Sequence, residues 1–447
     1  MMRRLPGLRR KAAWRCLQAI LVLVALAAGV VLWRGWHVPE VAEPGDSQSA
    51  NAEVLARGAY LVRIGACMGC HTAAGGQVLA GGGEVRTSFG NFFAPNLTPD
   101  AETGIGAWSV KDFRKAMRHG VAPGGLLLYP AFPYEQYTFL TDGDIDAIYH
   151  YLQSIPAIQH RTPPHRLRFP YGTQIALAAW RGLYFRPALE PTALGNAKPE
   201  QKNGAASESG QYLVQAVTHC AACHSPRNGL GALGGGQRLD GGWMAVEGWQ
   251  APSLLDSHEA GVQQWSVSDV VQFLRTGHTA GGATASGPMA DAVFWSTQYL
   301  TERDAAAIAV YLKDLPDAVE DLQPQLKTSK NIAAHVGNSR VVTLYEQYCA
   351  ACHGVRGEGQ LPAYPPLAGN RAVVRADPGN VLRSMLQGGY APTTIEQSVA
   401  PHGMPPFMQT LSDADIAALA SYIRQSWGNS ASAVATIDAF RARQGQP

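Results

Sequence analysis

Apolar residues recur at helical spacing in three separate stretches of the chain. The stretch from 140 to 156, LTDGDIDAIYHYLQSIP, has the same order of polar and apolar positions as 300 to 316 and 411 to 427. Each begins with Ser or Thr followed three residues later by Asp, which is a helix-capping pattern, and continues with apolar residues every three or four positions. The pattern predicts three equivalent helices, one closing each copy of a repeated module.

Further matches extend the repeat toward the amino-terminal side of each closing helix. The segment 58–62 (GAYLV) resembles 210–214 (GQYLV), and Leu344-Tyr345 occupies the corresponding place in the third copy. Trp108-Ser109 and Trp265-Ser266 each predict a helix that begins after an N-cap serine. Proline precedes leucine in a short segment of every copy, at 94–97, 251–254 and 364–367.

A repeat of 100 or more residues indicates domain duplication rather than a solenoid. Polar stretches rich in Pro, Lys and Ser at about 190–207 and 317–335 separate the copies. We therefore expect a mainly α-helical chain with three tandem domains and little sheet. The expected segments are an N-terminal segment 1–37, domains 51–160, 205–316 and 335–428, a connecting segment 161–204, a linker 317–334 and a tail 429–447.

The N-terminal segment contains an apolar run long enough to cross a bilayer as a helix. Between Cys16 and Trp33, Gln18 is the only polar side chain, and about 20 such residues span the hydrocarbon. Six basic residues and no acidic residue lie in the first fifteen positions, which favours a cytoplasmic amino terminus. A cleaved signal peptide is the alternative, because Ala25-Leu26-Ala27 has a small-x-small pattern. The apolar run continues through Trp33, so we favour a retained anchor.

Either reading places everything after about residue 37 outside the inner membrane, in the periplasm. The length of 447 residues leaves room for about three domains. Apart from the N-terminal cluster, the chain carries 30 basic and 34 acidic residues. A mildly acidic body has no basic face for phosphates, so we expect no nucleic-acid partner.

A second apolar segment, FPYGTQIALAAWRGLYF at 169–185, lies in the connecting region. Its apolar part is too short to span a membrane. We expect it to pack between domains, with a helix at the membrane interface as the alternative.

Six of the seven cysteines form three C-x-x-C-H motifs. Two thiols at this spacing can bond covalently to the two vinyl groups of one porphyrin, and the adjacent His then reaches the iron. Zinc sites instead bring two Cys pairs within a few tens of residues, whereas these pairs are more than 120 residues apart. The motifs predict three c-type haems, attached through Cys67, Cys70, Cys220, Cys223, Cys349 and Cys352 and ligated by His71, His224 and His353.

A second axial ligand is expected shortly before each closing helix. Methionine opposite histidine raises the reduction potential of haem c. Met289 follows Gly-Pro twelve residues before Thr301, and Met404 lies in a Gly-Met-Pro-Pro sequence eight residues before Ser412. These two are the predicted ligands. The alternative is that they only fill the core, and in the third copy Met408 competes with Met404.

The first copy lacks methionine at this place, where LYPAFPY holds Phe132. Met117 occupies the helix position of Leu274 and Met385, so a packing role is expected for it. His119 aligns with Thr276, and we expect it to be a solvated surface residue. Both remain alternative ligands. The hypothesis is that the first haem differs from the others, through an unusual ligand or an open five-coordinate iron.

These residues closely resemble the triple-haem cytochrome c subunits of bacterial membrane-bound dehydrogenases. The resemblance runs from about 51 to 428 and is carried by NLTPD at 96–100, TGIGAW at 103–108, LYPA at 128–131 and SWGN at 426–429. It implies three class-I-like cytochrome c domains, with the second axial ligands at Met289 and Met404. It also implies a separate catalytic dehydrogenase subunit of molybdenum, PQQ or flavin type, and electron delivery to ubiquinone.

The sequence departs from the family pattern at Phe132, where many members have methionine. That departure resembles the branch that serves molybdenum-containing aldehyde or heteroaromatic hydroxylases. The chain shows no nucleotide-binding glycine loop, no recognisable hydrolase triad and no distinctive carboxylate pair, so substrate chemistry is expected on another polypeptide. Two alternatives stay open: a peroxidase or reductase acting at a five-coordinate first haem, and an electron-input module of a terminal oxidase.

Overall fold

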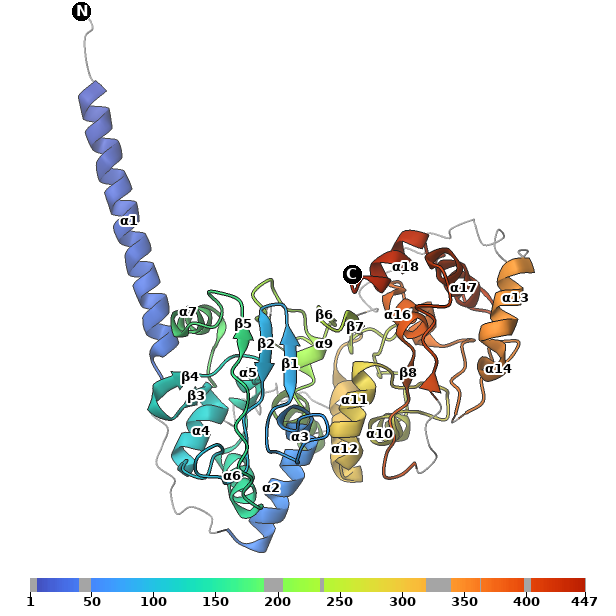
Figure 1. Ribbon diagram of the computed structural model, residues 1–447, viewed down its shortest axis with the longest axis horizontal. Coiled ribbons are helices and arrows are strands. Elements are labelled where there is room, and N and C mark those ends of the chain that lie inside the picture. The colour runs from blue at the N-terminus through green and yellow to red at the C-terminus, as the bar shows by residue number, and fades with distance from the viewer. Residues whose placement is uncertain are drawn as a thin grey trace, which may run out of the picture.

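A long N-terminal helix projects from a row of three helical units (Figure 1). The computed structural model describes residues 6–39, 50–188, 204–233, 237–318, 339–361, 363–397 and 403–446. Unit 1 comprises residues 52–188, unit 2 residues 204–314 and unit 3 residues 339–446. The predicted linkers at 190–207 and 317–335 lie largely outside the described residues, so their prediction stays untested.

Unit 1 is built from helices with three small antiparallel pairings around them. The strands β1, β2 and β5 form one sheet in the order β1-β2-β5, and β3 pairs with β4. The elements are α2 (Ala52–Ile64), α3 (Cys67–His71), β1 (Glu84–Thr87), β2 (Gly90–Phe93), α4 (Val110–His119), β3 (Val121–Ala122), η1 (Pro123–Gly125), β4 (Leu126–Leu127), α5 (Tyr134–Tyr137), α6 (Asp142–Ser154), β5 (Arg166–Leu167) and α7 (Gln174–Tyr184).

Units 2 and 3 repeat the main helices of unit 1 with shorter connections. Unit 2 contains α8 (Gly204–Tyr212), η3 (Leu213–Val217), α9 (Ala221–His224), β6 (Gly242–Met244), β7 (Trp249–Ala251), α10 (Val267–Thr276), α11 (Pro288–Trp295), η4 (Thr297–Tyr299) and α12 (Glu302–Asp314). Unit 3 contains α13 (Ser339–Tyr348), α14 (Ala350–His353), α15 (Arg371–Val374), α16 (Gly379–Gln387), β8 (Gly389–Tyr390), β9 (Gly403–Met404), α17 (Asp413–Gln425) and α18 (Thr436–Arg443).

The predicted closing helices are α6, α12 and α17, and each begins at the expected cap. The hydroxyls of Thr141, Thr301 and Ser412 accept hydrogen bonds from the backbone N–H three residues later. Such a cap satisfies one of the helix's unpaired N–H groups and stabilises it by about 1 kcal/mol. The helices expected after Ser109 and Ser266 are likewise confirmed as α4 and α10.

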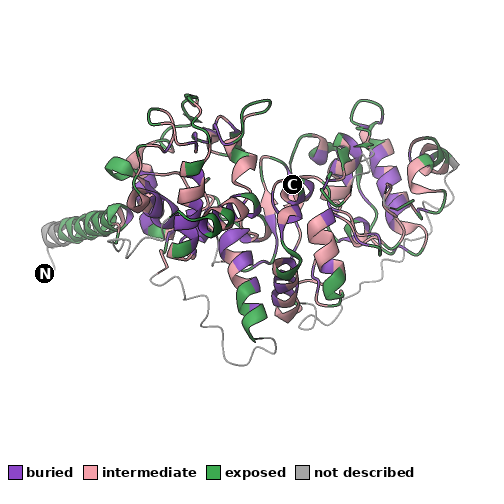
Figure 2. Cartoon of the chain, turned by 90° about the horizontal axis from the view of Figure 1, so that it is seen from below, coloured by how far each residue is buried: buried purple, intermediate pink, exposed green. Residues whose placement is uncertain are grey.

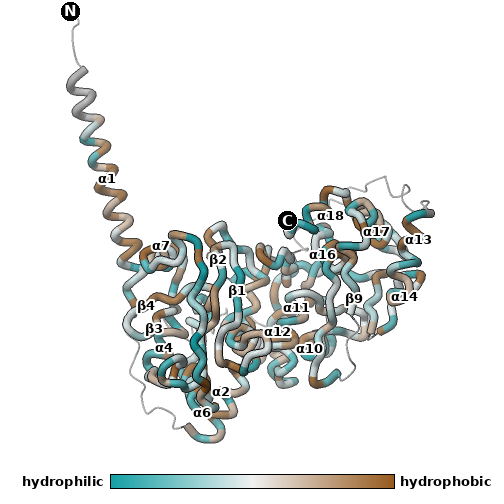
Figure 3. The backbone as a smooth tube through the Cα atoms, in the orientation of Figure 1, coloured by the Kyte–Doolittle hydropathy of each residue, from teal (hydrophilic) through white to brown (hydrophobic). Residues whose placement is uncertain are grey.

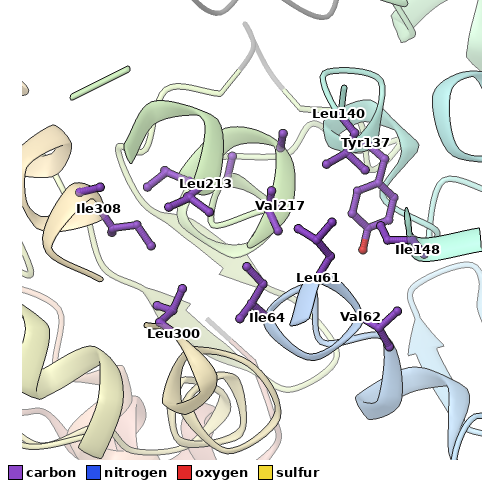
Figure 4. Close-up of a cluster of buried hydrophobic side chains, with 14 of the residues drawn as sticks. Leu61, Val62, Ile64, Tyr137, Leu140, Ile148, Leu213, Val217, Leu300 and Ile308 are labelled. Atoms are coloured by element: carbon purple, nitrogen blue, oxygen red, sulfur yellow. The ribbon is translucent and has the colours of Figure 1, made fainter. Parts of the chain in front are cut away.

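Units 1 and 2 share one hydrophobic core. Leu61 and Ile64 of α2 lie in the same cluster as Val217 of η3, Leu300 and Ile308 (Figure 4). Full burial of such a side chain stabilises the fold by about 1.5–3 kcal/mol, so much of the stability of each unit depends on the other. Residues coloured as buried occur on helices of all three units in Figure 2.

Unit 3 has its own core, and it extends beyond the boundary expected from the sequence. Ala439 and Ala442 of α18 are buried against α16 and α17. Residues after 428 therefore form a packed helix rather than the expected tail.

The helix α1 (Pro6–Trp36) carries the predicted apolar run, visible in brown along most of its length in Figure 3. Among the described residues one helix, over Ala13–Trp36, is long and apolar enough to cross a membrane. Its carboxyl-terminal end packs against α7 (Figure 1). Segment 169–185 packs between other parts of the chain, as expected: α7 contacts α1 and β4, and Nε1 of Trp180 donates a hydrogen bond to the carbonyl of Leu230 in unit 2.

Candidate functional site

The three motif histidines have the same hydrogen bond. Nδ1 of His71 lies 2.7 Å from the carbonyl oxygen of Pro95, Nδ1 of His224 lies 2.8 Å from that of Pro252, and Nδ1 of His353 lies 2.9 Å from that of Pro365. A carbonyl can only accept, so each Nδ1 carries the proton and each Nε2 keeps its lone pair. This is the arrangement that orients a histidine as a metal ligand.

The backbone of each motif histidine is held in a similarly repeated way. The carbonyl of His71 accepts a hydrogen bond of 2.8 Å from the N–H of Gly81, and His224 and His353 have the same bond from Gly241 and Gly359. All three glycines have positive φ, between 65° and 93°, a region that other residues rarely adopt. Both the ring and the main chain of each histidine are therefore fixed.

Glycine also allows the chain to approach the cysteines closely. A Cβ on Gly83 would lie 1.9 Å from the carbonyl oxygen of Cys70, and one on Gly242 would lie 2.4 Å from that of Cys223. Any larger residue would push the motif away from the segment that carries the proline carbonyl.

Burial disfavours the charged forms of the three motif histidines and of several motif thiols. Burial lowers the pKa of each motif histidine, with the proline carbonyl acting in the opposite direction. Burial also raises the pKa of Cys67 to about 12 and those of Cys223 and Cys349 to about 11. Neutral thiols are poor nucleophiles and poor ligands. Among the described residues no three His, Cys, Asp or Glu side chains gather into a group that could hold a metal ion.

The surroundings of the first motif fit a c-type haem. A small pocket beside Cys67 is lined by apolar residues of several elements: Leu61, Met117, Tyr137, Leu140, Ile148 and Val217. This wall is apolar and includes one motif thiol, Cys67, which is the environment that a largely apolar porphyrin requires.

The predicted methionines lie in different settings. Met404 is in β9, is partly buried and packs against the unit 3 core, which also contains Cys349. Met289 is the second residue of α11 and is partly buried. Met408, the alternative in the third copy, is 37% exposed. The ligand assignments remain predictions.

In the first copy, the surroundings of Met117 agree with the expectation from the sequence, whereas those of His119 do not. The place of the missing methionine is taken by Phe132. Phe132 packs against the shared core, with its ring 5.4 Å from that of Tyr137. Met117 is buried and lines the pocket beside Cys67, so it does pack in the core. The expectation of a solvated His119 is wrong, because it is only 6% exposed. Burial and, to a lesser extent, the positive charge of the nearby Arg181 lower the pKa of His119 to about 4.

The first two motifs lie next to each other across the boundary between units 1 and 2. Nε2 of His219, the residue before Cys220, lies 3.2 Å from the carbonyl oxygen of Gly65, two residues before Cys67. A Cβ on Gly69, inside the first motif, would lie 3.2 Å from Trp295. Neither contact was predicted from the sequence, because a single histidine before the second motif and a single tryptophan at the end of α11 belong to no motif.

Unit 3 contacts unit 2 mainly through polar side chains. Asn380 of α16 forms two hydrogen bonds with the backbone of Gln250, at 3.0 and 2.8 Å. Arg375 pairs with Glu259 at 3.0 Å, and the guanidinium of Arg371 lies over the ring of Trp265. The three units thus form one continuous series.

Comparisons with known proteins agree with this arrangement. The cytochrome c family model matches residues 55–156 and 339–427. The chain is 35% identical over 403 residues to the cytochrome c subunit of a quinone alcohol dehydrogenase from Gluconobacter oxydans, with 86% of this chain and 81% of the relative covered. It is also 35% identical to a gluconate 2-dehydrogenase cytochrome c subunit from Pantoea cypripedii, with 87% and 88% covered.

A third relative is much longer than this chain. It is a subunit of the nicotinate dehydrogenase from Pseudomonas putida, 35% identical over 402 residues, which are 90% of this chain but only 32% of that protein. The fold and the motifs define a protein with c-type cytochrome domains. The chain belongs to the family of cytochrome c subunits of bacterial dehydrogenases.

Proposed function

We propose that this chain binds three haem c groups and transfers electrons from a catalytic dehydrogenase subunit to ubiquinone. Haem c, when bound, supplies reversible one-electron chemistry at its iron. The cysteines of each motif attach one group, and His71, His224 and His353 ligate the irons. Met289 and Met404 are the proposed second ligands in units 2 and 3.

The observation that carries this proposal is the threefold bond from a motif histidine to a proline carbonyl. Because the bond recurs at 2.7, 2.8 and 2.9 Å, each unit offers the same oriented imidazole nitrogen. Rigid ligands limit the rearrangement that accompanies electron transfer, and hydrogen bonds to the ligand tune the potential. The equivalence of the three units supports three haem sites, including the one in unit 2 that the family model leaves unmatched.

The contacts between units support electron transfer along the chain. The first and second motifs are joined through His219 and Gly65, and units 2 and 3 are joined through Asn380 and Gln250. Such contacts keep neighbouring sites at fixed separations.

The names of the relatives support a catalytic dehydrogenase as the partner of this chain, and the apolar helix α1 supports a location at the membrane. The relatives are named as subunits of alcohol and gluconate dehydrogenases, so we propose a catalytic partner of PQQ, flavin or molybdenum type. The apolar helix over Ala13–Trp36 anchors the chain in the inner membrane, with the three units in the periplasm. Ubiquinone in that membrane is the proposed acceptor.

The test is to purify the full chain from membranes together with its bound partners and to follow haem reduction after adding alcohols, aldehydes, sugar acids and heteroaromatic acids. One substrate class should reduce the haems, and a dehydrogenase should be present. Replacing both cysteines of one motif with serine should remove one haem in three.

Two other results would contradict the proposal. Turnover of peroxide at a high-spin haem without a dehydrogenase would indicate a haem enzyme. Reduction only by a soluble cytochrome would indicate an input module of a terminal oxidase.

A further inference from the structure

The carboxyl-terminal end of α1 is locked against α7 by two glycines. A Cβ on Gly35 of α1 would lie 1.8 Å from the carbonyl oxygen of Ala178, and one on Gly182 of α7 would lie 1.9 Å from that of Val31. Small residues allow two helices to approach this closely. Nε of Arg181 also donates a 3.0 Å hydrogen bond to the carbonyl of Gly35. The base of α1 is therefore part of the folded body.

Two large apolar side chains of α7 are exposed beside its contact with α1. Ile175 and Leu183 are 64% and 47% exposed, and their spacing of eight residues places them on one side of the helix. Two turns next to α7 also expose apolar side chains. Phe169, in the loop between β5 and α7, is 89% exposed, and Leu230, whose carbonyl accepts a 2.9 Å bond from Trp180, is 43% exposed. We call these four side chains the α7 surface.

The charged residues that neighbour α7 in the sequence are all basic. No acidic residue occurs between Asp146 and Glu190 in the sequence. Arg166, Arg168 and Arg186 flank α7 and are exposed. Exposed apolar residues with only basic neighbours are typical of helices that lie in the headgroup region of a membrane.

The position of α7 along α1 indicates the depth at which it lies. It contacts α1 at Val31 and Gly35, within the last turns of the apolar helix, and Figure 1 shows the two helices side by side there. Trp33 and Trp36 lie at the same level and are 63% and 43% exposed. Tryptophans of this kind mark the boundary between hydrocarbon and water.

We propose that the α7 surface lies in the outer-leaflet interface of the membrane and holds unit 1 against it. This inference rests on the membrane anchorage proposed above. The occupant is the lipid surface, because α7 is fixed to the one helix that can cross the bilayer among the residues that the structure describes. Burying four large side chains in lipid would add to the binding that α1 provides. It would also fix the tilt of α1, and of the body attached to it, relative to the membrane plane.

The test uses the full, haem-loaded chain in nanodiscs of zwitterionic and anionic lipid. In a Cys16→Ala background, Ile175→Cys and Leu183→Cys each receive a small fluorophore. Ile437→Cys in α18 of unit 3 is the matched control, since Ile437 is an apolar helical residue that is 52% exposed. Lipids with a nitroxide near the headgroup should remove most of the fluorescence at 175 and 183 and leave the label at 437 unchanged.

A lipid nitroxide that removed the same fraction of the fluorescence at positions 175, 183 and 437 would overturn the proposal. So would quenching at 175 and 183 by a nitroxide attached to a co-purified subunit rather than to lipid. Haem content per chain, equal to that of the parent, shows that each variant is folded. The intact mass of the purified chain shows whether α1 is retained. A chain that has lost α1 would refute the membrane anchorage. A chain that retains α1 but whose labels are not quenched would refute only the contact of the α7 surface with lipid. Neither result affects electron transfer.

Discussion

The hydroxyl of Tyr212 in unit 2 donates a 2.7 Å hydrogen bond to the carboxylate of Asp144 in unit 1. Asp144 lies in the first turn of the closing helix α6 and also accepts two 2.8 Å bonds from Arg57. The reciprocal bond exists as well, because Tyr60 of unit 1 donates to Asp304 in the first turn of α12. Tyr60 and Tyr212 occupy equivalent positions in the repeat. Units 1 and 2 therefore bind each other with approximate twofold symmetry.

Tyr212→Phe is expected to destabilise the joined units. The variant keeps the ring and removes the donor, and a hydrogen bond to a charged group contributes about 1.5–3 kcal/mol. Urea unfolding measures the change in the free energy of unfolding. Tyr390→Phe is the control, since Tyr390 is 72% exposed. Equal losses in the two variants would contradict the importance of the bond.

Glu135→Gln is expected to stabilise the protein at neutral and higher pH. Burial raises the pKa of Glu135 to about 7, against a smaller opposite effect of Arg227. The folded state therefore holds the proton of Glu135 more tightly than the unfolded chain does. The resulting contribution to the free energy of unfolding is fully present below about pH 4.5, and it is lost as the pH rises to about 7.

The free energy of unfolding, measured from pH 4.5 to 8, tests the direction of this pH dependence. The parent should lose stability across the window, on the order of 1–3 kcal/mol, and Glu135→Gln should lose less. The exposed Glu208→Gln serves as control. A parallel fall in both variants would show that Glu135 is not responsible.

Met289→Ala and Met404→Ala are each expected to change one haem. Each variant should lose one sulfur-to-iron absorption band and lower the potential of one haem, because thioether ligation raises it. Optical spectra and a redox titration measure both effects. Met408→Ala should leave the spectrum unchanged. If Met408→Ala removed a band and Met404→Ala did not, the assignment in unit 3 would be wrong.

Phe132→Met is expected to give unit 1 a second axial ligand. The parent should contain one haem spectroscopically distinct from two His/Met haems. The substitution restores the residue that stands at this place in many members of the family, so one more low-spin, methionine-ligated haem should appear in magnetic and optical spectra. Three equivalent low-spin haems in the parent would refute the premise.

The parts of the fold that depend on local chemistry were predictable. Thr141, Thr301 and Ser412 cap their helices because a hydroxyl at that spacing can accept from the backbone wherever the chain goes. The motif cysteines and histidines were recognisable for the same reason, since haem attachment needs them within five consecutive residues. The prolines at 95, 252 and 365 were noticed as repeats, but not as acceptors, because every residue has a carbonyl.

The sequence by itself determined the repeat, the capped helices, the haem motifs and the apolar N-terminal helix, all of which depend on residues close together in the chain. Only the tertiary structure decided which carbonyl meets each histidine, that His119 is buried, that α18 completes unit 3 and that α7 packs on α1. These features join segments that are far apart, and they arise from shape complementarity and backbone hydrogen bonds. Neither leaves a residue-type pattern in the sequence.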